Sequence, residues 1–198
     1  MDAKNTATKK PKDETRMKGD TLLEAVEIPQ GVNVAMDKRT LKVKGEKGEV
    51  ARIMYDPKVR IEVKGEEVNF IAKPWSQKEK KKVGSMMAHF RNMIKGVQDG
   101  VTYKLKICSG HFPMNVAVSG KQLIVKNLLG EKIPRVLSFS ENVKVKIEGE
   151  IIIIEGIDKE LVAQTAASIE TLTRRVGFDR RRFQDGIYII DKNGKKAA

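Results

Sequence analysis

The sequence is poor in the side chains that disulfides, zinc sites and membrane spans require. It has a single cysteine, Cys108, and two histidines, His89 and His111, which excludes an internal disulfide and leaves too few ligands for a cysteine–histidine zinc site. No stretch of about 18 apolar residues is present, so no membrane-spanning helix is expected. Residues 1–20 lack the apolar core of a secretory signal. With the lone thiol, this predicts a reducing, cytosolic compartment.

Groups for catalysis and for base stacking are also scarce. Walker-type and dinucleotide-binding glycine motifs are absent, so no cofactor is expected. Cys108 and His111 are three residues apart, a spacing that on a strand directs side chains to opposite faces, so a nucleophile–base pair is not favoured. With one Trp, three Tyr and six Phe residues, the chain offers little for stacking on a sheet. The GxxG of residues 45–48 lies between two strand-like segments, which favours a hairpin turn over an RNA clamp.

What the chain has in excess is positive charge. Lys and Arg total 39 against 26 Asp and Glu, for a net charge of +13. The excess is concentrated, with +3 in residues 1–18, zero in residues 99–170 and +5 in residues 171–198. A basic tail beside a neutral body indicates a contact surface for a polyanion, and nucleic acid is the commonest one.

The two halves of the chain resemble one another. Residues 41–44 (LKVK) recur 82 positions later as residues 123–126 (LIVK), and residues 59–66 recur 84 positions later as 143–150. Apolar and charged residues alternate in both copies, which predicts strands with one buried face. Each copy then continues into a pattern of apolar residues at helical spacing.

The helix patterns carry start and stop signals. Ser76 and Glu79 predict a capping box for the first helix, and Asp158 predicts the N-cap of the second. The apolar stripe of the second helix extends to Val176, and Gly177 marks its end. The predicted fold is therefore α+β, with two tandem copies of a small antiparallel sheet covered by one helix. We expect a basic N-terminal extension at 1–20, repeats at 21–98 and 99–178, and a basic C-terminal RNA-binding segment at 179–198.

Two basic clusters are candidates for nucleic-acid contact. The weaker one opens the first helix, where cations oppose the helix dipole and therefore suggest a nearby anion. It consists of Lys78, Lys80, Lys81 and Lys82. The stronger one follows the second helix, with Arg174 and Arg175 expected at the helix end and Arg180, Arg181 and Arg182 beyond it. Phe183, Ile187 and Ile189 alternate after these arginines, which predicts that the segment anchors on the body while the arginines face outward.

Residues 181–192 (RRFQDGIYIIDK) give the chain a family resemblance. This segment resembles the large-subunit ribosomal protein number six family in its archaeal and eukaryotic branch. The family's start is similar to residues 27–32 and 43–49, and its second half to residues 111–116 and 128–132. The resemblance covers about residues 22–192. Phe178 departs from it, because the branch usually has a basic residue at that position.

The resemblance implies a duplicated α+β fold in the large ribosomal subunit of the cytoplasm. It also implies binding to large-subunit rRNA near the stalk base and the sarcin–ricin loop, with neighbouring ribosomal proteins, nearby translation factors and no catalytic residues. The expected RNA-binding residues are Arg174, Arg175, Arg180, Arg181, Arg182, Phe183, Asp185, Gly186, Tyr188, Lys192, Lys195 and Lys196, with His111 and the four lysines of the first helix as secondary candidates. No metal or small-molecule substrate is expected. Two alternatives stay open: an architectural nucleic-acid-binding protein outside the ribosome, and an enzyme that uses Cys108 and His111.

Overall fold

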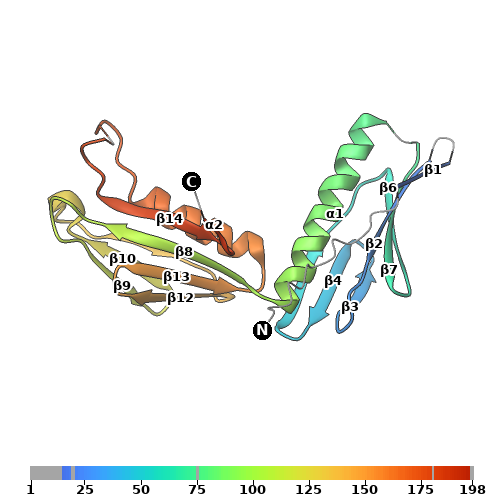
Figure 1. The fold of residues 1–198 in the computed structure, drawn as a ribbon, viewed down its shortest axis with the longest axis horizontal. Helices are drawn as coiled ribbons and strands as arrows, with labels where there is room; N and C mark the ends of the chain where they lie inside the picture. Colours follow the sequence, from blue (N-terminus) through green and yellow to red (C-terminus); the bar gives the residue numbers. More distant parts are fainter. Residues whose placement is uncertain (1–14, 19–20, 75, 180, 197–198) are drawn as a thin grey trace, which may run out of the picture. The chain divides into compact units, whose positions relative to one another are not determined.

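A computed structural model describes residues 15–18, 21–74, 76–179 and 181–196. The chain forms two compact units, residues 1–94 and residues 95–198, and the boundary falls near the end of the first helix. Each unit contains two antiparallel sheets, and a helix lies along the sheets of each (Figure 1). No helix in the described part of the chain is both long enough and apolar enough to cross a membrane.

Unit 1 contains a four-stranded sheet in the order β1-β2-β7-β6 and a three-stranded sheet in the order β3-β4-β5. Its elements are β1 (Thr15–Lys18), β2 (Thr21–Glu27), β3 (Asn33–Asp37), β4 (Thr40–Gly45), β5 (Gly48–Ile53), β6 (Val59–Lys64), β7 (Glu67–Ala72) and α1 (Gln77–Gln98). Gly45 pairs with Gly48, so the GxxG segment forms a two-residue hairpin turn as expected.

Unit 2 repeats this arrangement with a five-stranded sheet in the order β12-β13-β8-β14-β15 and a three-stranded sheet in the order β11-β10-β9. Its elements are β8 (Val101–Cys108), β9 (Asn115–Ser119), β10 (Gln122–Lys126), the 3₁₀ turn η1 (Leu128–Gly130), β11 (Arg135–Ser138), β12 (Val143–Glu148), β13 (Ile151–Gly156), α2 (Lys159–Leu172), β14 (Gly186–Lys192) and β15 (Lys195–Lys196).

Strand register confirms the predicted duplication. In unit 1 Thr40 pairs with Asp37, and 82 positions later Gln122 pairs with Ser119. The same equivalence holds for the hairpins β6–β7 and β12–β13, where residues 84 positions apart are paired identically. Because a slip of one residue would turn the apolar side chains outward, the shared register follows from the shared alternation of apolar residues. The predicted α+β fold is therefore confirmed, and each copy additionally contains a second, three-stranded sheet.

Helix α1 packs its apolar stripe against the sheets of unit 1. Val83, Met87 and Phe90 are buried, and the rings of Phe90 and Phe70 on β7 have centroids 6.1 Å apart. The predicted capping residues are in place, but their bonding differs from a capping box. The Ser76 hydroxyl accepts from the backbone N–H of Lys78 at 3.3 Å and itself donates to the Glu79 carboxylate.

Helix α2 begins as predicted and ends earlier than predicted. The Asp158 carboxylate accepts a hydrogen bond from the backbone N–H of Glu160 at 2.8 Å, which confirms the N-cap. The helix stops at Leu172, so the expectation that Val176 belongs to its buried stripe and that Arg174 and Arg175 end the helix is wrong. Val176 is 90% exposed. The chain instead leaves α2 at Thr173, whose hydroxyl accepts from the backbone N–H of Ile187 at 3.0 Å and so links the helix end to β14.

Residues 186–192 form β14, which pairs along β8 in the main sheet of unit 2. Ile187 is fully buried beneath α2, as its alternation with Phe183 and Ile189 suggested. A domain boundary between residues 178 and 179 would therefore separate α2 from β14, a strand of the sheet against which α2 packs. The connection between α2 and β14 comprises residues 173–185, and we call it the arginine loop.

Candidate nucleic-acid interface

The arginine loop lies at one end of unit 2, at the end that also carries the β8–β9 connection (orange-red and yellow in Figure 1). It follows α2, and it returns to the sheet at Gly186 on β14. Three sets of contacts join it to Gly110 and His111 and to Glu131 and Arg135 at the start of β11. The loop is therefore an ordered feature of the unit, despite its lack of helix or strand.

Asp185 is the buried anchor of the arginine loop. Its side chain is 3% exposed and accepts from the backbone N–H groups of Gly110 at 2.6 Å and His111 at 3.0 Å. The second carboxylate oxygen lies 2.6 Å from Nδ1 of His111. Burial, the largest single influence, would raise the pKa of Asp185, but the hydrogen bonds from His111 and Gly110 together outweigh it and hold the pKa below its ordinary value.

A row of rings continues outward from this anchor. The His111 ring stacks on Phe183, with centroids 5.0 Å apart, and Phe183 meets the edge of Phe178 at 5.1 Å. The guanidinium of Arg175 lies over the Phe178 ring, 4.7 Å from its centroid. Aromatic and cation–π contacts of this kind stabilise by about 1 kcal/mol each. They fix the middle of the loop against the β8–β9 connection.

On its other side, the loop is held by the carboxylate of Glu131, which lies between two arginines. Glu131 accepts from Arg135 through both oxygens, at 2.7 and 2.8 Å, and lies 3.1 Å from the guanidinium of Arg175. The hydrogen bond with Arg135 holds the pKa of Glu131 below its ordinary value, against the opposing effect of partial burial. Arg135 also donates to the backbone carbonyls of Leu172 and Arg174, at 2.5 and 3.4 Å. The first of these bonds satisfies a carbonyl group that the end of α2 would otherwise leave unpaired.

The remaining arginines of the loop point their charge outward. Arg174, Arg181 and Arg182 are exposed, and in the described part of the chain none of them forms an ion pair. Asp179, two residues before Arg181, uses its carboxylate to accept the backbone N–H of Arg181 at 2.9 Å. Arg180 lies outside the described residues. Positive side chains on a fixed backbone, without carboxylate partners, are suited to phosphate groups.

The other expected contact residues occupy two different environments. Lys192, Lys195 and Lys196 are exposed on the β14–β15 hairpin beside the main sheet. Gly186 is buried, its φ of 156° is a backbone conformation that favours glycine, and a Cβ there would lie 3.3 Å from the Tyr188 hydroxyl oxygen. Tyr188 is half-buried beside the loop. The structure thus separates expected contact residues that face solvent from residues that hold the loop in place.

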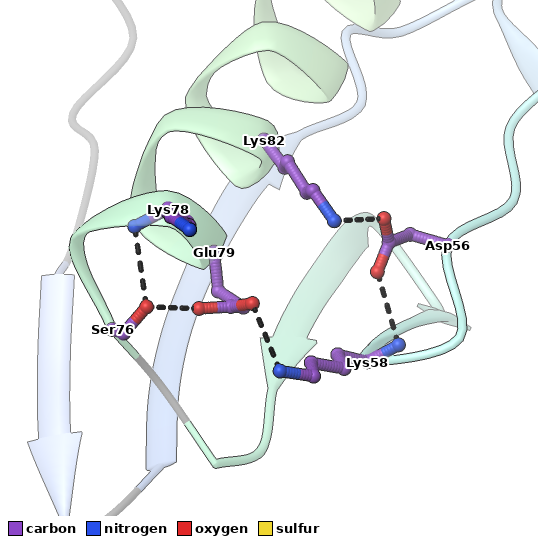
Figure 2. Close-up of polar contacts among 6 residues, drawn as sticks. All are labelled: Asp56, Lys58, Ser76, Lys78, Glu79 and Lys82. Atoms are coloured by element: carbon purple, nitrogen blue, oxygen red, sulfur yellow. Dashed lines mark hydrogen bonds and ion pairs between the residues drawn. The ribbon is translucent and has the colours of Figure 1, made fainter.

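The lysines at the start of α1 belong to a polar cluster in unit 1. Figure 2 shows Lys82 reaching Asp56, with the ammonium nitrogen 2.6 Å from the carboxylate, while Lys58 lies 3.4 Å from Glu79. The hydrogen bond from Lys82 is the main cause that lowers the pKa of Asp56. The hydrogen bond from Ser76 is the main cause that lowers the pKa of Glu79.

This cluster accounts for part of the predicted anion at the helix start. Asp56 and Glu79 supply negative charge beside the N-terminus of α1, where it is favourable. Lys82 is engaged in holding the loop before β6 against the helix. Lys78, Lys80 and Lys81 are exposed and form no ion pair among the residues that the structure describes, so they remain the secondary candidates of this unit.

Sequence reasoning did not identify Gly110, Glu131 and Arg135 as parts of the interface. Glu131 and Arg135 have the spacing of a helical ion pair, but here Glu131 precedes β11 and Arg135 is its first residue. The contact between Glu131 and Arg175 spans 44 positions of sequence. Only the fold brings them together. Phe178 was noted as a departure from the family pattern, and its ring now supports Arg175.

The structure gives His111 a positioning role. The sequence analysis places Cys108 and His111 on one strand, but β8 ends at Cys108 and His111 lies in the following loop. There its ring is held by Asp185 and Phe183. Among the described residues, no group of three or more His, Cys, Asp or Glu side chains could hold a metal ion.

Comparisons with known proteins agree with this duplicated fold. The profile of the family described as ribosomal protein L6 matches residues 28–100 and again residues 112–186. A protein of Methanosarcina mazei named large ribosomal subunit protein uL6 is 44% identical over 167 residues, which is 84% of this chain and 95% of the relative. Proteins of the same name from Aeropyrum pernix and Sulfurisphaera tokodaii are 46% and 43% identical, over 86% and 89% of this chain and 94% and 95% of their own length. The chain therefore belongs to the ribosomal protein L6 family, in its archaeal form.

Proposed function

We propose that this protein is a structural constituent of the large ribosomal subunit and that it binds large-subunit rRNA through the arginine loop of unit 2. The observation that carries the proposal is the loop itself: exposed Arg174, Arg181 and Arg182 stand on a backbone that Asp185 and Glu131 hold in place. The names of the relatives support the ribosomal location. The role requires no cofactor and no catalytic group.

A fixed loop binds RNA more tightly than a flexible one with the same charge. Ordering a flexible segment on binding costs free energy for each immobilised side chain and backbone residue. Here the stack of His111, Phe183 and Phe178 has already met much of that cost. Arginine also suits the task, because its planar group donates to two phosphate oxygens at once. Recognition of this kind follows the shape and phosphate positions of folded RNA more than its sequence.

We place the contact near the stalk base and the sarcin–ricin loop, in the cytoplasmic large subunit, beside other ribosomal proteins and close to where translation factors dock. The resemblance of residues 181–192 to the family supports this placement. The proposed contact surface comprises Arg174, Arg175, Arg180, Arg181, Arg182, Tyr188, Lys192, Lys195 and Lys196. Phe183, Asp185, Gly186 and His111 position it, and Lys78, Lys80 and Lys81 form a secondary surface.

The test measures binding of the full chain to large-subunit rRNA over a range of salt concentrations. Each phosphate contact contributes about 0.7–0.9 to the slope of log affinity against log salt. Changing Arg174, Arg181 and Arg182 together to alanine should weaken binding and reduce that slope by about two. The matched control changes Lys44, Arg60 and Lys144 to alanine, which removes the same charge from exposed strand positions that carry no ion pair in the described structure.

The control variant should keep the slope within about half a unit of the parent. Equal slopes for the two triple variants would show that the loop arginines are not specific phosphate ligands. Sucrose-gradient sedimentation provides the second readout: the parent protein should migrate with large subunits, and the loop variant should be depleted from them. Failure of the parent protein to bind rRNA or subunits would overturn the proposal as a whole.

A further inference from the structure

A pocket of about 310 Å³ opens in unit 2 between the end of α2, the arginine loop and β14. Its volume is at the lower end of the range of small-ligand pockets, roughly 300–1,000 Å³. Phe178, Phe183 and Tyr188 supply aromatic wall, and Arg174 and Arg175 lie at the same pocket. All of these residues belong to unit 2, and the residues that hold the arginine loop also shape the pocket.

The pocket contains a carboxylate that the proposed phosphate contact does not explain. Glu170 lines it, is half-buried, and its side chain accepts no hydrogen bond within the described residues. A carboxylate repels phosphate, so the pocket is not a phosphate site, although arginines stand beside it. It accepts N–H donors, as a carboxylate does when it reads an amino group of a base. The second carboxylate, Asp185, is already occupied by Gly110 and His111.

The pocket has aromatic walls, a hydrogen-bond acceptor inside it and cations beside it. Together these features match one class of ligand. An unpaired RNA base stacks on aromatic side chains and is read along its pairing edge, while its phosphate remains outside. Guanine presents two adjacent N–H donors on that edge, which match the two oxygens of one carboxylate. Uracil offers a single donor between two carbonyl oxygens that a carboxylate would repel.

We propose that this pocket binds a single unpaired RNA base, that Glu170 selects guanine, and that Arg174 holds the adjoining phosphate. The inference rests on the proposed rRNA contact of the arginine loop and extends it. Exposed arginines give affinity without regard to sequence, whereas the pocket gives a preference for one base at one position of the RNA.

The first experiment titrates the isotope-labelled full chain with GMP, UMP and inorganic phosphate, and follows backbone amide signals by NMR. GMP should shift the amides of Thr171, Thr173 and Arg174 in a saturable way, with an affinity about tenfold above that of UMP. Glu170→Gln should remove this preference while leaving the spectrum of the remaining chain unchanged. Equal shifts with phosphate alone would show an anion site and overturn the proposal.

The second experiment fills the pocket and measures rRNA binding. Thr171 lines the pocket and is exposed on α2, so Thr171→Trp should block the pocket without disturbing the core. Gln164→Trp is the control, two turns earlier on the same helix, exposed and away from the pocket. The Thr171 variant should lose GMP binding and about tenfold in rRNA affinity at an unchanged salt slope, while the Gln164 variant should behave as the parent.

The outcomes separate the two proposals. If rRNA binding of the parent shows the steep salt slope but neither GMP nor Thr171→Trp has an effect, the pocket proposal is overturned and the phosphate contact stands. If the parent protein binds no rRNA, both the proposed function and this inference fail. Should Thr171→Trp unfold, Glu170→Gln still decides the matter, because it conserves shape and changes only the acceptor.

Discussion

Helices α1 and α2 start from equivalent positions and end differently. Their caps, Ser76 and Asp158, are 82 residues apart, the same offset that relates the β3–β4 pair to the β9–β10 pair. Helix α1 runs for 22 residues and leads directly into β8, whereas α2 stops after 14. The residues that would form the last two turns of α2 instead form the start of the arginine loop. Truncation of one repeated helix is therefore what gives unit 2 its candidate interface.

The flanking strands differ in a related way. In unit 1 β1 pairs with the outer edge of β2, and in unit 2 β14 pairs with the outer edge of β8. The same sheet position is filled from the segment before the repeat in one unit and from the segment after it in the other. Only the second solution carries the chain across the end of the helix, which creates a long connection that the sheet holds at both ends.

One equivalent turn shows how side chains diverge on a shared backbone. Lys38 and Gly120 both have positive φ, at 50° and 57°, and the next residue, Arg39 or Lys121, accepts the same backbone hydrogen bond, from Met54 at 2.8 Å or Phe139 at 3.0 Å. The ammonium group of Lys121 forms an ion pair with Glu141, whereas the guanidinium of Arg39 lies over the Tyr55 ring, 4.1 Å from its centroid. The fold specifies the turn, and the side chains around it decide how its cation is used.

The largest effect on the free energy of unfolding should come from an equivalent pair of positions on α1 and α2 that differ in burial. Phe90 and Leu172 are 82 positions apart, but Phe90 is fully buried against Phe70 and Leu172 is only half-buried. Phe90→Ala should cost about 3–5 kcal/mol of unfolding free energy, and Leu172→Ala about 1–2 kcal/mol. Urea unfolding followed by circular dichroism measures both values. Equal losses would mean that α2 packs as completely as α1 at this point.

The next effect concerns Asp185, the buried anchor of the arginine loop in unit 2. Asp185→Ala leaves the N–H groups of Gly110 and His111 without their acceptor, and should cost about 2–4 kcal/mol at neutral pH. The pKa of Asp185 is lowered in the folded state. The stabilisation that its carboxylate gives the folded protein is therefore complete above pH 3.8, the ordinary pKa of the group, and is lost as the pH falls through the folded pKa.

Unfolding measured between neutral and strongly acidic pH should therefore show the parent and Asp185→Ala converging only at the acidic end. A difference that stays constant down to low pH would mean that the ionised carboxylate is not the source of the stabilisation. His111→Ala removes one of the three donors and should show a smaller loss.

The two helix caps offer a matched pair with a smaller effect. Ser76→Ala and Asp158→Ala each remove the acceptor for one backbone N–H at the helix start, and each should cost about 1 kcal/mol. Ser76→Ala should also release Glu79 from its hydroxyl partner and raise the pKa of that carboxyl toward its ordinary value. NMR titration of Glu79 measures this shift, with Asp158→Ala as the control that leaves it unchanged.

The smallest effect tests the end of α2. Val176 and Ile94 are 82 residues apart, but Ile94 is buried and Val176 is 90% exposed. Val176→Ala should change stability by less than about 0.5 kcal/mol, whereas Ile94→Ala should cost about 2–4 kcal/mol. Thermal denaturation of the two variants compares them directly. A loss above 1 kcal/mol at Val176 would place this side chain in a core, as a longer α2 would require.

Much of the fold follows from local patterns in the sequence. The alternation in residues 59–64 and 143–148 predicts the strands, and the 82- and 84-residue offsets predict the duplication, since burial of one sheet face determines which residues alternate. The second sheet of each unit was not separated from the first, because alternation identifies a strand but not its neighbour. The end of α2 was missed because Val176 continues the helical period, while Thr173 is engaged by a strand that follows much later in the chain.

For the candidate interface, the sequence by itself determined where positive charge accumulates and which family the chain resembles, because both are properties of residue order. Only the tertiary structure decided which of those residues face solvent and which are internal supports. Asp185 and His111 are 74 positions apart, and Glu131 and Arg175 are 44 apart, and no local pattern links them. The physical reason is that a buried carboxylate needs several donors at once, and these donors come together only when β8, β14 and the end of α2 have packed.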